Sequence, residues 1–312
     1  MGNVNEEIDE DEKIIVKNIY NEIFSRFSEK YIIVFLCGGA SNNRNLSLRD
    51  KVRNLLENEK KSAWYKPFKI FYPEDLLMDI LNKTKGADLL SYEQFLAENS
   101  HIIAIVCESP GSLVELGAFT NNKYTVDKVI AAVEKNKARN KSFIMQGPIK
   151  YLKKKHKLNV IEYGQDETVF AKQLAKNIRE KKRLSDNKSS MISLTTISGM
   201  HYFIQLILYF FKFLEYKEIK KMIEVIVKDK NLSIDEEKMN MLMSSALKLL
   251  FEDKKIVKIV EGEHAAYKLT HDGFVTIQSM INECTNECTI VGLCDTIRIE
   301  LMYKKFYKSP HS

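Results

Sequence analysis

The sequence has little of what marks fibrous or disordered chains. Only 5 prolines and 12 glycines occur in 312 residues, which excludes a collagen-like or linker-like chain. An apolar fraction of 45% with 29% charged residues is that of a folded protein and excludes global disorder. The length allows about two domains, each large enough to bury its own core.

Long hydrophobic runs are also missing. The longest apolar run, from Tyr202 to Leu214, is interrupted by Gln205 and Lys212 and is too short to span a bilayer. We interpret it as a buried helix or as a contact in a homo-oligomer. The acidic start has no basic region leading into an apolar one, and Glu6 stands where a myristoylation signal needs Ser or Thr. We therefore expect a cytoplasmic protein that makes no contact with a membrane.

Cysteine is sparse as well. The 5 cysteines are scattered along a chain that we expect to be cytoplasmic, so a disulfide framework is excluded. Cys284, Cys288 and Cys294 lack the paired spacing of structural zinc sites, although His264 and His271 are near enough in sequence to complete four ligands. The spacing favours packed small residues, and we expect neither a metal nor a cofactor.

Positive charge is present but unevenly distributed. The net charge is +6, residues 1–13 are acidic, and two runs, at 150–157 and 176–183, are strongly basic. Such clusters suit a polyanion such as nucleic acid, although either run alone can be a solvated helix face. The candidate nucleic-acid-binding residues are Lys150, Lys153, Lys154, Lys155, Lys157, Lys181, Lys182 and Arg183.

The first half of the chain alternates apolar runs of strand length with amphipathic segments of helical pattern. The runs lie at 31–36, 68–72, 102–107, 129–133 and 158–163. Because the runs themselves do not alternate between apolar and polar residues, the strands should be buried on both faces. The pattern predicts an α/β domain over residues 30–184, with a doubly wound five-stranded parallel sheet. Residues 1–29 form an acidic segment with a first helix.

The second half has a different organisation. A polar stretch rich in Ser and Thr at 185–200 predicts a linker. Beyond it, the order of helices followed by a β-hairpin predicts a smaller winged-helix-type domain over residues 201–312. We place the second and third helices of this domain within 235–253 and the tip of the wing at 261–264.

The expected recognition helix is poorly suited to reading bases. Over residues 240–251 it carries only Lys248 as a cation. Direct readout of a base sequence needs side chains that this helix mostly lacks. Both DNA and protein therefore stay open as partners of the second domain.

Polar and small residues follow the first two expected strands. In doubly wound sheets, ligands bind beyond the carboxyl ends of the strands, so loops at these ends are candidates for a substrate site. A plain turn also explains the glycines of the first loop, and a conventional helix start explains the acids of the second. The candidate substrate-binding residues here are Cys37, Gly38, Gly39, Tyr72, Glu74 and Asp75.

The loop after the third strand carries two glutamates. The spacing of Ser112 and Glu115 fits a capping box with Ser112 as the N-cap, and spacing alone favours capping. However, Glu115 also stands at a helix start on the ligand edge, with Glu108 a short loop away. One carboxylate that attacks an anomeric carbon, with a nearby acid or base, suits glycosidic chemistry. Ser109, Gly111 and Ser112 are the further candidate substrate-binding residues of this loop.

Four stretches of the chain resemble one family. They are "FLCGG" after the first strand, "IFYPEDL" after the second, "CESPGSLVELGAF" after the third, and "NKSFIMQGPIKYL" further on. Together they look like the nucleoside 2-deoxyribosyltransferase-like domain of the ribosyltransferase/DNA-binding effectors of tripartite bacterial retrons. The resemblance covers residues 30–180 by motif, and the order of a linker and a winged-helix unit extends it weakly over the whole chain.

The resemblance implies roles for the two glutamates. In the wider deoxyribosyltransferase family the glutamate before Gly-x-Ala is the nucleophile, and Glu115 matches that position. The upstream acid is commonly Asp and is Glu108 in this sequence, which leaves its role open. The first loop also departs from the usual nucleoside-enzyme loop, so the accepted base is open too.

The resemblance further implies an antiphage system with two partners, a reverse transcriptase and the multicopy single-stranded DNA-RNA hybrid that it makes. These partners would restrain a toxic effector that cleaves or transfers at an N-glycosidic bond of a nucleotide, either NAD or a deoxynucleotide. Two other functions stay open. One is a non-catalytic, nucleotide-sensing regulator that binds DNA, and the other is a structural clamp of a nucleoprotein complex.

Overall fold

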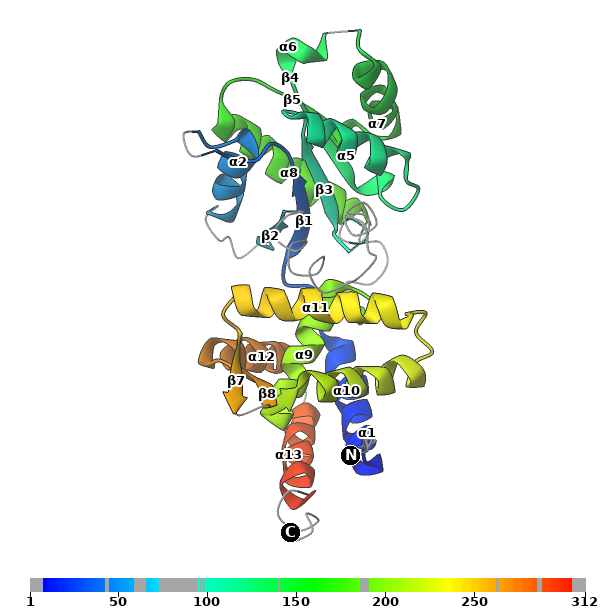
Figure 1. Ribbon diagram of the computed structural model, residues 1–312, viewed down its shortest axis with the longest axis vertical. Helices are drawn as coiled ribbons and strands as arrows, with labels where there is room; N and C mark the ends of the chain where they lie inside the picture. The colour runs from blue at the N-terminus through cyan, green and yellow to red at the C-terminus, as the bar shows by residue number, and fades with distance from the viewer. Residues whose placement is uncertain are drawn as a thin grey trace. The chain divides into compact units, whose positions relative to one another are not determined.

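The computed structural model divides the chain into two compact units (Figure 1). One unit comprises residues 30–190, and the other comprises residues 1–29 together with 191–312. The structure describes residues 8–42, 45–58, 66–72, 95, 97, 99–139, 141–185, 191–261, 264–284 and 288–304. Each unit is described below by itself.

The first unit is built on a five-stranded, all-parallel sheet, as predicted. Its strands are β1 (Ile32–Cys37), β2 (Phe68–Phe71), β3 (Ile102–Val106), β4 (Val129–Glu134) and β5 (Val160–Tyr163), in the order β2-β1-β3-β4-β5. The last strand begins later than expected because Lys157–Asn159 form a 3-10 turn. The strand order reverses between β1 and β3, and such a switch point is where sheets of this kind bind ligands.

Helices cover both faces of this sheet. They are α2 (Leu48–Glu57), α5 (Pro110–Asn121), the short α6 (Lys135–Ala138), α7 (Lys150–Lys155) and α8 (Glu167–Ser185), with a π-helical turn at Met145–Ile149. On one face, Val52 of α2 and Phe170 of α8 join the apolar cluster formed by alternate strand residues. On the other face, the Phe119 ring of α5 meets the Phe35 ring of β1 edge-on, with centroids 5.9 Å apart. Burial on both faces explains why the strands read as continuous apolar runs.

The second unit has the element order of a winged helix. Its elements are α1 (Glu10–Asn18), α9 (Ile197–Phe211), β6 (Phe213–Glu215), α10 (Tyr216–Asp229), α11 (Glu236–Glu252), β7 (Ile256–Glu261), β8 (His264–Leu269), α12 (His271–Cys284) and α13 (Cys288–Tyr303). The three strands form an antiparallel sheet in the order β6-β8-β7. The prediction of two helices within 235–253 was wrong, because Asp235 caps one continuous helix, α11, and the helix before it is α10.

Helix α9 is the centre of this second unit. Nearly all of its side chains are buried, including the fully buried Gln205, so the expectation of a buried helix is confirmed. The rings of Tyr20 and Phe24 contact Phe203 of α9 with centroids 5.8 and 5.2 Å apart, which packs the N-terminal segment into this unit. Across the part of the chain that the structure describes, no helix is long and apolar enough to cross a membrane.

One lysine predicted to bind nucleic acid belongs to the core. Lys181 is only 9% exposed, and its Nζ donates hydrogen bonds to the carbonyl oxygen of Val129, 2.8 Å away, and to Oδ1 of Asn159. Burial lowers the pKa of Lys181 to about 8. The prediction for Lys181 was therefore wrong, because the side chain joins α8 to the beginning of β4.

We expect Lys181→Met to destabilise the protein more at alkaline than at neutral pH. The folded-state pKa of about 8 lies below the ordinary value of 10.5, so the unfolded chain holds more protons between these values and stability rises with pH across that window. Methionine removes this gain, and the loss of unfolding free energy should be about 1–2 kcal/mol larger near pH 9.5 than near pH 7.

Urea denaturation of both proteins at the two pH values measures the difference. Lys172→Met is the matched control, because Lys172 is exposed on the same helix. If the two stability curves stay parallel over this pH range, Lys181 does not titrate as a buried group.

Candidate active site

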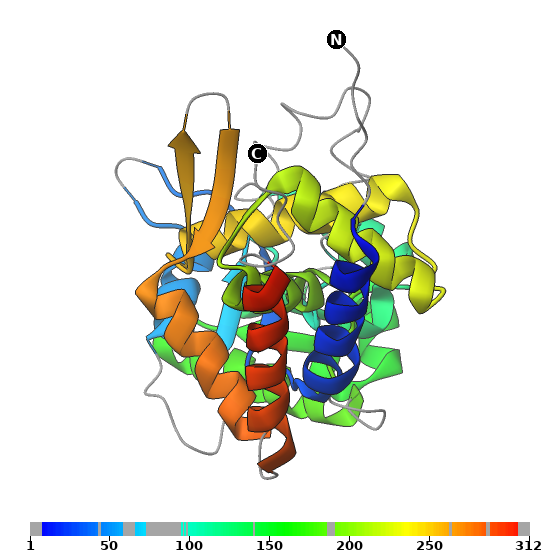
Figure 2. The same ribbon diagram turned by 90° about the horizontal axis from the view of Figure 1, so that it is seen from below.

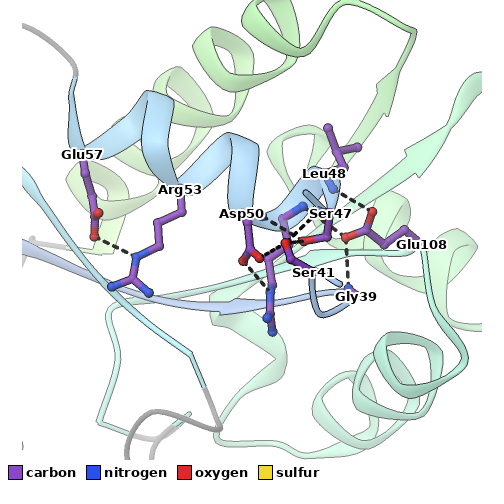
Figure 3. Close-up of polar contacts among 9 residues, drawn as sticks. Gly39, Ser41, Ser47, Leu48, Asp50, Arg53, Glu57 and Glu108 are labelled. Atoms are coloured by element: carbon purple, nitrogen blue, oxygen red, sulfur yellow. Dashed lines mark hydrogen bonds and ion pairs between the residues drawn. The ribbon is translucent and has the colours of Figure 1, made fainter. Parts of the chain in front are cut away.

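The carboxylate of Glu108 joins three segments at the switch point of the sheet. Glu108 follows β3, and its Oε1 accepts the backbone N–H groups of Gly39, at 3.0 Å, and Arg49, at 3.1 Å. Its Oε2 accepts the N–H of Leu48 at 3.1 Å (Figure 3). Glu108 therefore holds the loop after β1 and the first turn of α2 against the end of β3. The first turn of a helix favours such an anion because its N–H groups have no partners within the helix.

The glycines of the first loop are needed for close packing inside the protein. A Cβ atom on Gly39 would lie 3.3 Å from Cγ of Glu108, and one on Gly38 would lie 2.7 Å from Cβ of Arg49. Cys37 is buried as the last residue of β1. The loop lies at the predicted ligand edge of the sheet. However, the Gly39 N–H already donates a hydrogen bond to Glu108 and is not available to a substrate.

The first turns of α2 carry a polar cluster that sequence reasoning missed. Ser41 bonds to Asp50, and its Oγ accepts the N–H of Ser47 at 2.9 Å (Figure 3). Ser47 in turn caps α2 by accepting the N–H of Asp50 at 3.1 Å. Serines close to a helix start are a sequence signal for a cap, but the partner of Ser41 depends on how the loop folds back.

Tyr72 meets this cluster from the end of β2. The guanidinium groups of Arg49 and Arg53 lie 4.0 and 4.3 Å from the centre of its ring. Burial and the neighbouring Asp50 raise the pKa of the Tyr72 hydroxyl above its ordinary value. Of the second predicted loop, the structure thus brings Tyr72 to the edge, whereas Glu74 and Asp75 lie outside the residues that it describes.

Helix α5 is capped one turn earlier than predicted. Ser109 is the N-cap, and its Oγ accepts the N–H of Ser112 at 3.2 Å, while Oγ of Ser112 accepts the N–H of Ser109 at 3.1 Å. The predicted box of Ser112 and Glu115 was therefore wrong. Pro110 accounts for the shift, because proline has no N–H and a fixed φ, and both suit the first position of a helix. Gly111 is exposed in this first turn, and Glu115 has no part in the cap.

Glu115 lies beside the end of β3. Its Oε2 atom is buried. Burial, and then the charge of Glu115, raise the pKa of the Cys107 thiol to about 12, so the carboxylate and the thiol are neighbours. A thiol with this pKa stays protonated at neutral pH and is a weak nucleophile. The carboxylate of Glu115 is thus the better nucleophile of the pair.

Two further side chains at this edge were not predicted. Glu134 and Tyr163 are the last residues of β4 and β5, and the two are register partners. Burial, followed by the charges of Glu108 and Glu134, raises the pKa of Tyr163 to about 12, so this edge carries a neutral hydroxyl group. The sequence signal that could have found Glu134 and Tyr163 is a polar side chain at the end of a buried strand.

Most of the other residues predicted to bind nucleic acid are exposed. Lys153 pairs with Glu162 at 2.6 Å and Lys155 with Asp127 at 2.7 Å. Lys182 is partly buried. The exposed members with no acidic partner among the described residues are Lys150, Lys154, Lys157 and Arg183. Elsewhere in the described ranges, no group of three or more His, Cys, Asp and Glu side chains could hold a metal ion.

The three backbone bonds of Glu108 lead to a test that does not depend on any reaction. In Glu108→Gln, the amide nitrogen is a donor that cannot accept an N–H group, so at least one of the three bonds is lost. We expect the free energy of unfolding to fall by about 1–3 kcal/mol. The amides of Gly39, Leu48 and Arg49 should exchange with deuterium faster than in the parent protein.

Glu57→Gln is the control for this variant. Glu57 lies at the end of α2, the helix whose first turn Glu108 holds, and it accepts a hydrogen bond of 3.1 Å from the Arg53 side chain (Figure 3). Its exchange pattern at the first turn of α2 should match that of the parent. Unchanged exchange in Glu108→Gln would mean that Glu108 does not hold this loop.

Comparisons with known proteins agree on one family. The family described as STM3845 retron effector protein matches residues 45–258. These residues are more than half of the chain. The Escherichia coli protein named as the ribosyltransferase/DNA-binding protein of retron Ec86 is 27% identical over 306 residues, covering 94% of this chain and 92% of that protein. The protein of the same name from retron Ec73 of Escherichia coli is 31% identical over 138 residues, covering 41% of this chain and 43% of that protein. The chain therefore belongs to the retron effector protein family.

Proposed function

We propose that this retron effector breaks an N-glycosidic bond of a nucleotide, with Glu115 as the nucleophile. The observation that carries the proposal is the cap of α5. Because Ser109 and Ser112 cap the helix by themselves, Glu115 is not required for capping. Its carboxylate lies at the ligand edge of the sheet with one buried oxygen. A carboxylate at this edge that does not serve the cap is a candidate nucleophile.

The reaction proceeds in two steps. An oxygen of Glu115 forms a bond to the anomeric carbon of the sugar while the bond to the base breaks, and the base leaves with the electron pair. Nicotinamide leaves NAD as a neutral molecule, whereas the base of a deoxynucleotide takes up a proton from water. Water, or a second acceptor, then attacks the anomeric carbon and releases Glu115. With water the result is hydrolysis, and with another acceptor it is transfer. NAD and deoxynucleotides are the candidate substrates.

In this proposal Glu108 is a positioning residue that holds the neighbouring loop in place. It is not the acid or base that the sequence suggested. Its two oxygens already accept three N–H groups. It therefore fixes the loop after β1 next to the site of reaction. Tyr163, whose pKa is raised to about 12, supplies a neutral hydroxyl that can donate a hydrogen bond to the substrate at the same edge.

The partners proposed for this chain are the reverse transcriptase and its multicopy DNA-RNA hybrid, which restrain the effector until it is released. Membership of the retron effector family supports this assignment, as do the names of the two relatives, which join a ribosyltransferase with DNA binding. The exposed side chains Lys150, Lys154 and Lys157 supply positive charge for contacts with phosphate groups.

Replacing the nucleophile tests the reaction. We expect Glu115→Gln to lower the rate of base release by about a thousandfold or more, because removal of a catalytic nucleophile has effects of at least this size. The melting temperature should stay close to that of the parent, since Glu115 takes no part in the cap. Chromatography of the purified protein incubated with NAD, deoxynucleotides and nucleosides measures the free base.

Glu162→Gln is the matched control, because Glu162 is exposed on β5 of the same unit. It should release base at the parental rate. If Glu115→Gln is as active as the parent, or if the parent releases no base from any of these substrates, the proposed reaction is wrong.

A further inference from the structure

Several lysines of the winged-helix unit have acidic partners, as Lys17 has Asp229 at 2.9 Å and Lys220 has Glu236 at 2.7 Å. Among the described residues, four exposed lysines in or beside the three strands have none. They are Lys212, Lys254, Lys258 and Lys268. Lys228 of α10 also has none within the described ranges, but it stands apart from the strands in the sequence.

Three of these lysines meet at one end of the sheet. Lys268 pairs in register with Phe213 on one side and with Val257 on the other, so the three side chains form a row across one face. Lys212 directly precedes Phe213. The carbonyl oxygen of Lys254 accepts a hydrogen bond of 2.7 Å from Thr270, which brings Lys254 to the same end. We call Lys212, Phe213, Lys254, Val257 and Lys268 the wing face.

The backbone at two of these positions would suit glycine better than lysine. Lys212 has a φ of 68° and Lys254 a φ of 54°, and the described residues include only one other non-glycine residue with positive φ, Asn231. Lys212 follows α9, and Lys254 follows the C-cap of α11. Glycine is favoured after a helix because this conformation crowds a Cβ atom. Lysine there can also complement the helix dipole, and the experiment must separate this role from binding.

The apolar members of the wing face are unusually open. Phe213 is 59% exposed and Val257 38% exposed, on either side of Lys268. An exposed aromatic ring among cations is the arrangement by which proteins hold single-stranded nucleic acid, with lysines at the phosphates and a base stacked on the ring. Figure 2 shows the β7–β8 hairpin extending past the helices of its own unit, and the wing face lies at the other end of the two strands, where Ile256 pairs with Leu269.

The recognition helix favours the same conclusion. The first turn of α11 carries the acids Glu236 and Glu237, which repel a phosphate backbone. Over residues 240–251 its only cation is Lys248. Insertion of this helix into the major groove of a duplex would therefore gain few contacts to phosphates or bases.

We propose that the wing face binds single-stranded nucleic acid. Lys212, Lys254 and Lys268 contact phosphates, and Phe213 stacks on a base. This inference goes beyond the proposed glycosidic reaction and does not depend on it, because the residues lie in the other unit of the chain. A protein without enzymatic activity could still bind in this way, and the binding assay below makes no use of catalysis.

The decisive variant replaces both strained lysines by glycine. Lys212→Gly with Lys254→Gly in the full-length chain suits the backbone, so its melting temperature should equal or exceed that of the parent. Its affinity for a fluorescent oligothymidine, measured by anisotropy, should fall about tenfold or more. The slope of log K against log salt concentration should become shallower by about 1.4, at about 0.7 for each lost phosphate contact on a single strand.

Phe213→Ala tests the stacking. We expect a loss of affinity of about five- to a hundredfold, the range for removal of one base-stacking side chain, with little change in salt dependence. Phe143→Ala is the matched control, because Phe143 is 85% exposed in the α/β unit. It should bind oligothymidine as the parent does.

Several outcomes would overturn the proposal. One is parental affinity in both the lysine and the phenylalanine variants. A second is equal binding of duplex and single strand with no effect of Phe213→Ala. A third is loss of oligothymidine binding only when Lys150, Lys154 and Lys157 are replaced. The fourth is binding of vesicles of phosphatidylserine by the parent, abolished in the double glycine variant, without binding of oligothymidine.

Discussion

The arrangement of the candidate active site depends on one partly buried contact, in which the carboxylate of Glu108 accepts three backbone N–H groups. The end of β3, the loop after β1 and the first turn of α2 would otherwise approach each other with unpaired polar groups. Both glycines of the first loop pack closely around this contact, since a Cβ atom on Gly38 would collide with Cβ of Arg49, and one on Gly39 would lie tightly against the Glu108 side chain. An internal carboxylate thus takes the position at a helix start that a ligand anion can otherwise fill.

This contact separates the roles of Glu108, which follows β3, and Glu115, which lies in α5. Glu108 is engaged in holding the fold, whereas Glu115 takes part neither in that contact nor in the cap of α5, which Ser109 and Ser112 complete. Cys107 precedes Glu108 in the chain and is a neighbour of Glu115, and burial together with the Glu115 charge raises its pKa to about 12, so the thiol stays protonated. Glu108 therefore stabilises the edge of the sheet, and we propose that Glu115 is the carboxylate that meets the substrate.

Much of the fold was predictable from the sequence, because short continuous apolar runs that alternate with amphipathic segments are typical of parallel strands covered on both faces. The errors came from contacts that periodicity does not encode. Pro110 moved the helix start by one turn, and burial against Asn159 removed Lys181 from the basic surface. Glu134 and Tyr163 join the site only through the register of β4 and β5, which depends on the folded sheet.

The proposed reaction requires Glu115 to form a covalent bond to the sugar. Mass spectrometry of the protein, quenched during turnover of a deoxynucleotide or NAD and then digested, detects that bond. We expect the peptide containing Glu115 to gain the mass of the substrate without its base, that is, the sugar with its attached phosphate groups, and we expect the Glu115→Gln protein to gain none. A sugar attached to a different side chain, such as Glu134 or Cys107, would contradict the proposed reaction.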